Sequence, residues 1–158
     1  MGRAHGQGQG GLPHRQTAQA MGHGQGQGPV PAAELLADEL RGAGLEPRLL
    51  ESAPGRGNVV ARLRGTGELP PLLLTAHLDV VEADPTCWDH PPFCGDVHEG
   101  CLWGRGAIDM LNLTSAMAVA FRRLADEGFQ PRGDLIYFGV ADEEAGGVWG
   151  AEWMAEHH

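Results

Sequence analysis

A histidine and an aspartate stand two residues apart at the end of an apolar stretch of the chain. These are the residue types expected for one half of a metal site. His77 and Asp79 follow the leucine run 72–74. Side chains two apart on an extended chain point to the same side, so the Asp79 carboxylate can reach the imidazole of His77. A metal-bound histidine commonly donates its second N–H to a carboxylate, which fixes its tautomer and raises its basicity. Taken alone, the pair also fits a strand-end histidine that is hydrogen-bonded to its neighbour.

A second acidic position precedes a predicted helix. Asp109 ends the segment GRGAID, residues 104–109, directly before a helical pattern. An aspartate at such a place is often the N-cap of the helix. The glycines also suggest a phosphate-binding loop, but the segment lacks the third glycine of GxGxxG and is not a Walker loop. Two interpretations of Asp109 remain, a helix cap and a ligand-binding carboxylate.

Three adjacent acids follow another apolar stretch. Asp142, Glu143 and Glu144 come directly after the segment YFGVA. Their carboxylates repel one another unless a cation compensates the charge. Because adjacent side chains point in opposed directions, one glutamate can bind a metal while the other turns toward water on that metal. Histidine nitrogen and carboxylate oxygen are donors for zinc and similar divalent ions. The absence of cysteine from all three segments favours a catalytic over a structural metal site.

The pattern of apolar residues predicts the elements that position these groups. Helical spacing of leucine and alanine over 31–44, again over 113–124, and a start at 147 predict three helices. Strands are predicted over 45–51, 58–65, 71–77 and 133–144, the last ending in acidic residues. The uniformly apolar segment 71–77 is typical of a central strand covered on both faces. Strands that alternate with helices predict an α/β layered domain with a largely parallel central sheet flanked by helices, with ligands beyond the carboxyl ends of its strands.

The composition of the chain limits the classes of partner that we expect it to bind. The chain has 158 residues and a formal net charge of −10, which argues against nucleic acid and anionic membranes, since both attract a positive surface. No stretch approaches the ~18 apolar residues that span a bilayer, and no apolar signal segment is recognised near the start. The three cysteines form no CxxC pair and fit small thiols in a reducing compartment. We therefore expect a cytoplasmic protein without a nucleic-acid or membrane partner.

The first 29 residues differ in composition from the rest of the chain. HGQGQG occurs at 5–10 and again at 23–28, and apolar residues are sparse. Such a segment cannot bury enough surface to offset the entropy of ordering. We expect a disordered Gly/Gln/His-rich tail over 1–29 and an ordered unit over 30–158.

Three segments together resemble a known family. They are LLLTAHLDVV at 72–81, WGRGAIDM at 103–110 and VADEEAGG at 140–147. Their order and spacing resemble the M20 family of metallopeptidases and the related N-acyl amino-acid deacylases. The resemblance implies a zinc-exopeptidase-like α/β fold, of which residues 30–158 are the incomplete N-terminal portion of the catalytic domain.

The resemblance also implies a role for each site residue. His77 binds one zinc, Asp109 bridges that zinc to a second, and Glu144 binds the second. Asp79 orients His77, and Glu143 is the general base that takes a proton from the attacking water. The implied cofactor is a pair of Zn²⁺ ions, with Co²⁺ or Mn²⁺ as substitutes. The implied reaction is hydrolysis of an amide bond in a small peptide or N-acyl amino acid, of the carboxypeptidase or dipeptidase type.

The chain departs from the family pattern in two ways. Leu111 stands where the family usually has lysine, beside the site and not at a ligand. A further acidic ligand, a final histidine ligand and a second, dimer-forming domain have no counterpart in these 158 residues. Full-length relatives are expected to be homodimers. The alternative for this chain is an inactive, truncated fragment with at most weak metal binding.

Overall fold

The computed structural model describes residues 30–158, so the expected disordered tail over 1–29 lies outside the described residues. The first described element is helix α2 (Val30–Gly42). Its apolar residues recur along one side, as an amphipathic helix requires. The buried ones are Ala32, Ala33, Leu36, Ala37 and Leu40. Gly44 follows with a φ of 75°, and this left-handed residue turns the chain away from the helix axis.

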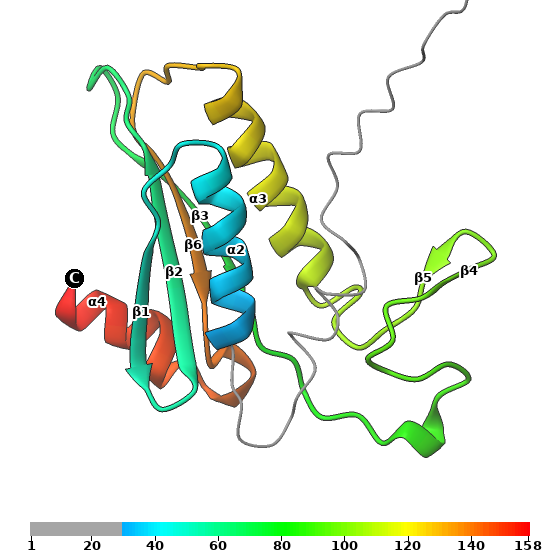
Figure 1. Cartoon of the computed structure of the whole chain (residues 1–158). Helices are drawn as coiled ribbons and strands as arrows, with labels where there is room; N and C mark the ends of the chain where they lie inside the picture. Colours follow the sequence, from blue (N-terminus) through cyan, green and yellow to red (C-terminus); the bar gives the residue numbers. More distant parts are fainter. Residues whose placement is uncertain (1–29) are drawn as a thin grey trace, which may run out of the picture.

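Four strands form the main sheet, in the order β1-β2-β6-β3 (Figure 1). Strands β1 (Arg48–Ala53), β2 (Arg56–Leu63) and β6 (Leu135–Val140) pair antiparallel in turn. Strand β3 (Leu72–His77) pairs parallel with β6, with Leu72 opposite Leu135 and His77 opposite Val140. Strands β3 and β6 therefore end side by side.

The α/β class and the flanking helices are confirmed, but the sheet is mixed and not largely parallel as expected. Parallel neighbours need a crossover of roughly a dozen residues or more, usually with a helix. Only the connection from β3 to β6 is of this kind, and it contains helix α3 (Leu111–Asp126). A tight turn at Gly55, with a φ of 78°, joins β1 to β2 and makes that pair antiparallel.

Helices α2 and α3 pack against one face of the sheet and bury its core (Figure 1). Tyr137 of β6 and Phe121 of α3 are fully buried, with their ring centroids 6.1 Å apart. The Tyr137 hydroxyl donates a hydrogen bond to the Thr114 carbonyl at 3.2 Å. The Thr114 hydroxyl in turn donates to the His77 carbonyl at 2.8 Å. These bonds fasten the first turns of α3 to β6 and to the end of β3.

The other described elements are short. They are η1 (Pro85–Cys87), β4 (Val97–His98), β5 (Cys101–Leu102), η2 (Glu143–Ala145), η3 (Val148–Glu152) and α4 (Trp153–His157). The strands β4 and β5 form a small separate hairpin. The three cysteines are free thiols. No helix of the described part is long and apolar enough to cross a membrane.

Strand β3 is an edge strand among residues 30–158, whereas its apolar sequence predicted a central strand covered on both faces. Leu72 is 56% exposed and Leu73 is 52% exposed. An apolar edge with unpaired backbone groups is a template for pairing with another chain. In this part of the chain, the free edge of β3 is therefore the surface most suited to self-association.

Changing the two leucines should reduce this association. We expect the 158-residue chain to self-associate with increasing concentration, and Leu72→Lys combined with Leu73→Lys to suppress it, because charged residues protect strand edges. Sedimentation velocity over a concentration series measures the effect. Val97→Lys, on the separate hairpin, is the matched control because Val97 is also exposed. Equal association of the double variant and the parent chain would contradict the assignment to β3.

Candidate metal centre

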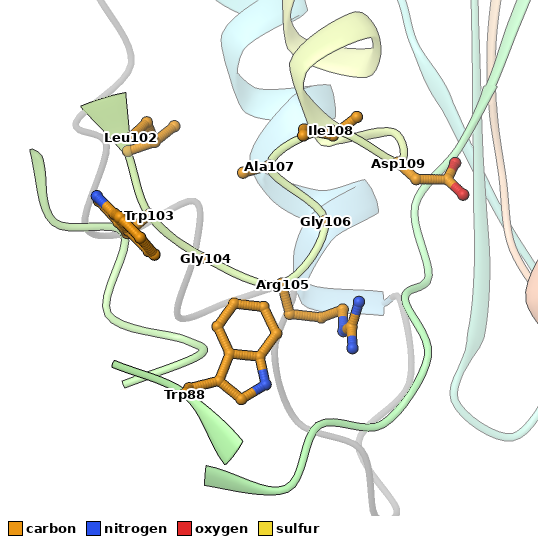
Figure 2. A pocket seen from close by; sticks show the side chains of 9 residues that line it. All are labelled: Trp88, Leu102, Trp103, Gly104, Arg105, Gly106, Ala107, Ile108 and Asp109. Atoms are coloured by element: carbon orange, nitrogen blue, oxygen red, sulfur yellow. The ribbon is translucent and has the colours of Figure 1, made fainter. Parts of the chain in front are cut away.

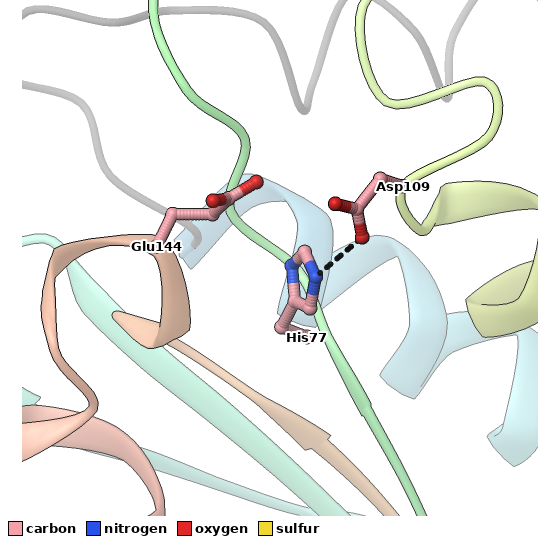
Figure 3. Close-up of side chains that lie close together, drawn as sticks. All are labelled: His77, Asp109 and Glu144. Carbon is pink, nitrogen blue, oxygen red and sulfur yellow. Dashed lines mark hydrogen bonds and ion pairs between the residues drawn. The ribbon is translucent and has the colours of Figure 1, made fainter.

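Three chain segments bring His77, Asp109 and Glu144 together at the carboxyl ends of β3 and β6 (Figure 3). His77 is the last residue of β3, Asp109 lies just before α3, and Glu144 lies in η2, after β6. One donor atom from each lies within 4.8 Å of the others. The structure therefore unites the three residues that the sequence analysis named as metal ligands.

Asp109 is not the N-cap of α3, which was its alternative interpretation. Met110 occupies the N-cap position, and no side chain caps this helix end. The Asp109 side chain is 78% exposed and its Oδ1 lies 3.2 Å from Nε2 of His77. This leaves its second carboxylate oxygen available to another partner.

His77 is held in one orientation by the backbone. Its side chain is only 6% exposed, and its Nδ1 lies 2.9 Å from the carbonyl oxygen of Asp79. Because a carbonyl only accepts, Nδ1 carries the hydrogen in this bond. Nε2 then faces Asp109, with the Glu143 carboxylate at 3.8 Å. This is the tautomer in which Nε2 is free to bind a metal.

The Asp79 carboxylate makes different contacts from those expected. Its Oδ1 is 3.7 Å from Nδ1 of His77, beyond a hydrogen bond. Its two oxygens instead accept the backbone N–H of Glu143 at 3.2 Å and of Glu144 at 3.0 Å. In the described structure Asp79 thus orients His77 through its main chain and organises the glutamate turn through its side chain.

The charges around His77 favour a cation. Burial lowers the pKa of His77, but the hydrogen bonds to the Asp79 carbonyl and the Asp109 carboxylate and the negative charges of Asp79 and Glu143 together raise it above its ordinary value. A raised histidine pKa means that a positive charge is stabilised at this place. The same carboxylates would stabilise a divalent ion bound at Nε2.

Asp142 has a structural role that separates it from the two glutamates. Its side chain is 4% exposed, and its Oδ1 lies 2.8 Å from Nε of Arg56. Its Oδ2 accepts the backbone N–H of Trp149 at 3.2 Å. The residue has a φ of 68°, an uncommon value for a residue other than glycine. Asp142 therefore faces the sheet, whereas the next two residues face the site.

Asn58 of β2 holds the loop 141–149, which contains the two glutamates, at both of its ends. Asn58 is fully buried, and its Oδ1 accepts the N–H of Ala141 at 2.9 Å. Its amide nitrogen donates to the carbonyl of Trp149 at 3.1 Å, and the Ser52 hydroxyl donates to the same carbonyl. A Cβ at Gly150 would lie 1.9 Å from the Ala141 carbonyl oxygen, so only glycine lets the two ends approach this closely.

Arg56 and Asn58 were not identified from the sequence as site residues. They contact the glutamate loop from more than 80 residues away, as the pair Asn58 and Ala141 shows with a separation of 83. The one available signal was an asparagine at the start of an apolar strand, since a buried amide needs partners.

Removing the Arg56 charge should destabilise the loop. Arg56→Gln leaves the buried Asp142 carboxylate without its cation, which costs about 3 kcal/mol, the low end for such pairs because Arg56 is partly exposed. Urea unfolding followed by circular dichroism measures the loss. The control is Arg62→Gln on the same strand, whose more exposed and longer pair with Asp134, at 3.4 Å, is worth about 1 kcal/mol. Equal losses in the two variants would contradict a special role for Arg56.

Comparison with known proteins agrees with this fold and shows the family of the chain. The model of peptidase family M20/M25/M40 matches residues 73–158. A succinyl-diaminopimelate desuccinylase from Rhodopseudomonas palustris (strain TIE-1) is 38% identical over 135 residues, which is 79% of this chain and 34% of the relative. The chain therefore belongs to the peptidase family M20/M25/M40. It spans about one third of the length of the curated relatives it matches.

Solved structures show the same fold. An M20 family metallo-carboxypeptidase from Sulfolobus solfataricus matches with a TM-score of 0.71 and 22% identity, over 84% of this chain and 30% of that protein. A Bacillus subtilis protein described as a dinuclear metal binding peptidase from the M20 family matches with a TM-score of 0.62 and 15% identity, over 90% of this chain and 37% of that one. The sheet and helices described above are thus part of a larger fold in these proteins.

Proposed function

We propose that this chain contributes the first part of a metal-dependent active site that hydrolyses an amide bond. The convergence of His77, Asp109 and Glu144 within 4.8 Å, with Glu143 beside them, is the observation that carries the proposal. Family membership supports it, because metal-binding peptidases and a desuccinylase are among the similar proteins.

The donors fit zinc and related divalent ions. A neutral imidazole nitrogen and carboxylate oxygens are typical catalytic ligands for zinc, and Co²⁺ or Mn²⁺ accept the same donors. We propose that Asp109 is shared by two ions, with His77 on one and Glu144 on the other. Ions held there would polarise the amide carbonyl and acidify a bound water.

Glu143 is proposed as the group that moves the proton. It is not a member of the three-residue donor cluster, yet its carboxylate lies 3.8 Å from Nε2 of His77. The side chain is 59% exposed, and its backbone N–H is fixed by Asp79. A base held beside the ligands and open to solvent can take a proton from water and give it to the leaving amine.

The proposed substrates are small peptides or N-acyl amino acids. The desuccinylase supports the N-acyl class, and the metallo-carboxypeptidase supports the peptide class. The expected homodimer of full-length relatives remains a prediction.

An inactive fragment with weak metal binding is the second candidate, and the number of ligands favours it for residues 30–158 alone. The described residues supply three donors to the cluster, so with Asp109 shared each ion has two. Catalytic zinc sites ordinarily have three protein ligands each. Strong binding and hydrolysis then require ligands from outside these residues.

Metal binding is the first test. Zn²⁺ or Co²⁺ titrated into the metal-free chain should bind, and Asp109→Asn should weaken binding by more than about tenfold, because even a supporting partner of a ligand is worth that much. Isothermal titration calorimetry and Co²⁺ absorption give the affinity and the ligand geometry. Asp38→Asn, which changes an exposed aspartate on α2, is the control. Unchanged metal binding in Asp109→Asn would contradict the proposal that Asp109 is a ligand shared by two ions.

The role of Glu143 is tested where hydrolysis can be measured. In a longer protein that contains these residues, Glu143→Gln should lower kcat by roughly 10²–10⁴, the usual contribution of a positioned base. Metal content from elemental analysis should stay near that of the parent protein. Glu144→Gln is the comparison, and it should lose metal. If the two phenotypes are exchanged, the two glutamates have the opposite roles.

A further inference from the structure

A pocket of about 300 Å³ lies beside the metal centre and shares Asp109 with it (Figure 2). Its walls are the segment 102–109 and the ring of Trp88. Trp103 and Leu102 form one side, and Ile108 lies near the opposite end of the loop. Ile108 is 85% exposed, so the pocket offers apolar surface that no other described residue covers. A ligand in this pocket would contact both apolar side chains and the edge of the proposed site.

Arg105 is the one basic residue that lines the pocket. Its guanidinium lies 5.1 Å from the centroid of the Trp88 ring, a cation–π contact. Its Nε is buried and has no hydrogen-bond partner among the described residues. No ion pair joins it to the nearby Asp109, whose Oδ1 lies 3.2 Å from Nε2 of His77.

Six of the other eight described arginines pair with carboxylates, whereas Arg48 and Arg64, like Arg105, do not. The paired ones are Arg41, Arg56, Arg62, Arg122, Arg123 and Arg132. Arg105 makes no ion pair within residues 30–158, although the chain has 21 acidic residues against 11 basic ones. A charged donor left without an acceptor in a pocket costs free energy. The cost is recovered if a ligand brings the acceptor.

Carboxylate is the acceptor that arginine matches best. The planar guanidinium presents parallel N–H groups that fit the two oxygens of a carboxylate. We propose that Arg105 binds the carboxylate of an anionic substrate, with the Trp88, Trp103 and Ile108 side chains against its aliphatic part. The proposal rests on the proposed function, in which the scissile amide lies at Asp109. It assigns to Arg105 the recognition of the free carboxylate that acyl amino acids and peptides of the proposed class carry.

The test measures anion binding without metal, so that it does not depend on hydrolysis. Butyrate is titrated into the metal-free chain at low protein concentration, and tryptophan fluorescence reports occupancy of the pocket. Butyrate should give a saturable change. Butyramide, its neutral counterpart, and sulfate, an anion without an apolar part, should bind at least about tenfold more weakly, as expected for one charge-assisted bond.

Variants locate the binding site. Arg105→Gln should weaken butyrate binding at least about tenfold, and Arg105→Lys should weaken it less, because charge is kept and the planar fork is lost. Arg132→Gln, at an exposed pair with Glu68, should bind as the parent chain does. Circular dichroism checks that each variant folds. If Arg105→Gln does not fold, the parent titrations and Arg105→Lys still decide.

Each outcome has a fixed meaning. No saturable butyrate binding, equal binding of butyramide or sulfate, or undiminished binding by Arg105→Gln would each overturn the carboxylate site. Metal binding that depends on Asp109 together with any of these results would leave the proposed function standing and remove only the pocket. Butyrate binding that depends on Arg105, in a chain that binds no metal, would support the carboxylate site and contradict the proposed function.

Discussion

Strands β3 and β6 run parallel with His77 opposite Val140, and this register places the two segments that follow them side by side. Every contact of the candidate centre depends on that pairing. The Asp79 carboxylate can reach the N–H groups of Glu143 and Glu144 only because both strands end at the same edge. The Thr114 bond to the end of β3 then sets where α3 begins, and with it the position of Asp109. The pairing of β3 with β6 thus determines which side chains meet at the candidate metal centre.

The acids at this edge divide into two groups with different partners. Asp79 and Asp142 are satisfied by backbone N–H groups and, for Asp142, by Arg56. Asp109, Glu143 and Glu144 are exposed and surround one buried histidine. The first group makes the turn rigid, and the second group supplies unneutralised charge in a fixed place. A binding site for a cation needs both, because free carboxylates on a mobile turn would move apart.

The sequence predicted the convergence of His77, Asp109 and Glu144 well, because each residue lies at the end of a strand or the start of a helix. Such ends meet at one edge of an α/β sheet. The direction of β2 and the edge position of β3 were not predictable from local patterns, because apolar runs do not reveal their neighbours. Arg56, Asn58 and Arg105 were missed for a related reason. Their roles arise from contacts with distant residues, and an isolated arginine carries no signal of its partner.

Tyr137 has a consequence for the spectroscopy of the chain. It is the single tyrosine, and burial raises the pKa of its phenol well above the ordinary value of about 10. The folded chain therefore keeps this phenol neutral at a pH where an unfolded chain would ionise it. Folding stability is then unaffected by this group below pH ~10 and falls as the pH rises further, since the unfolded state alone loses the proton. Ultraviolet absorption of tyrosinate in alkali would follow the opening of the packing between α3 and β6 directly, without an added probe.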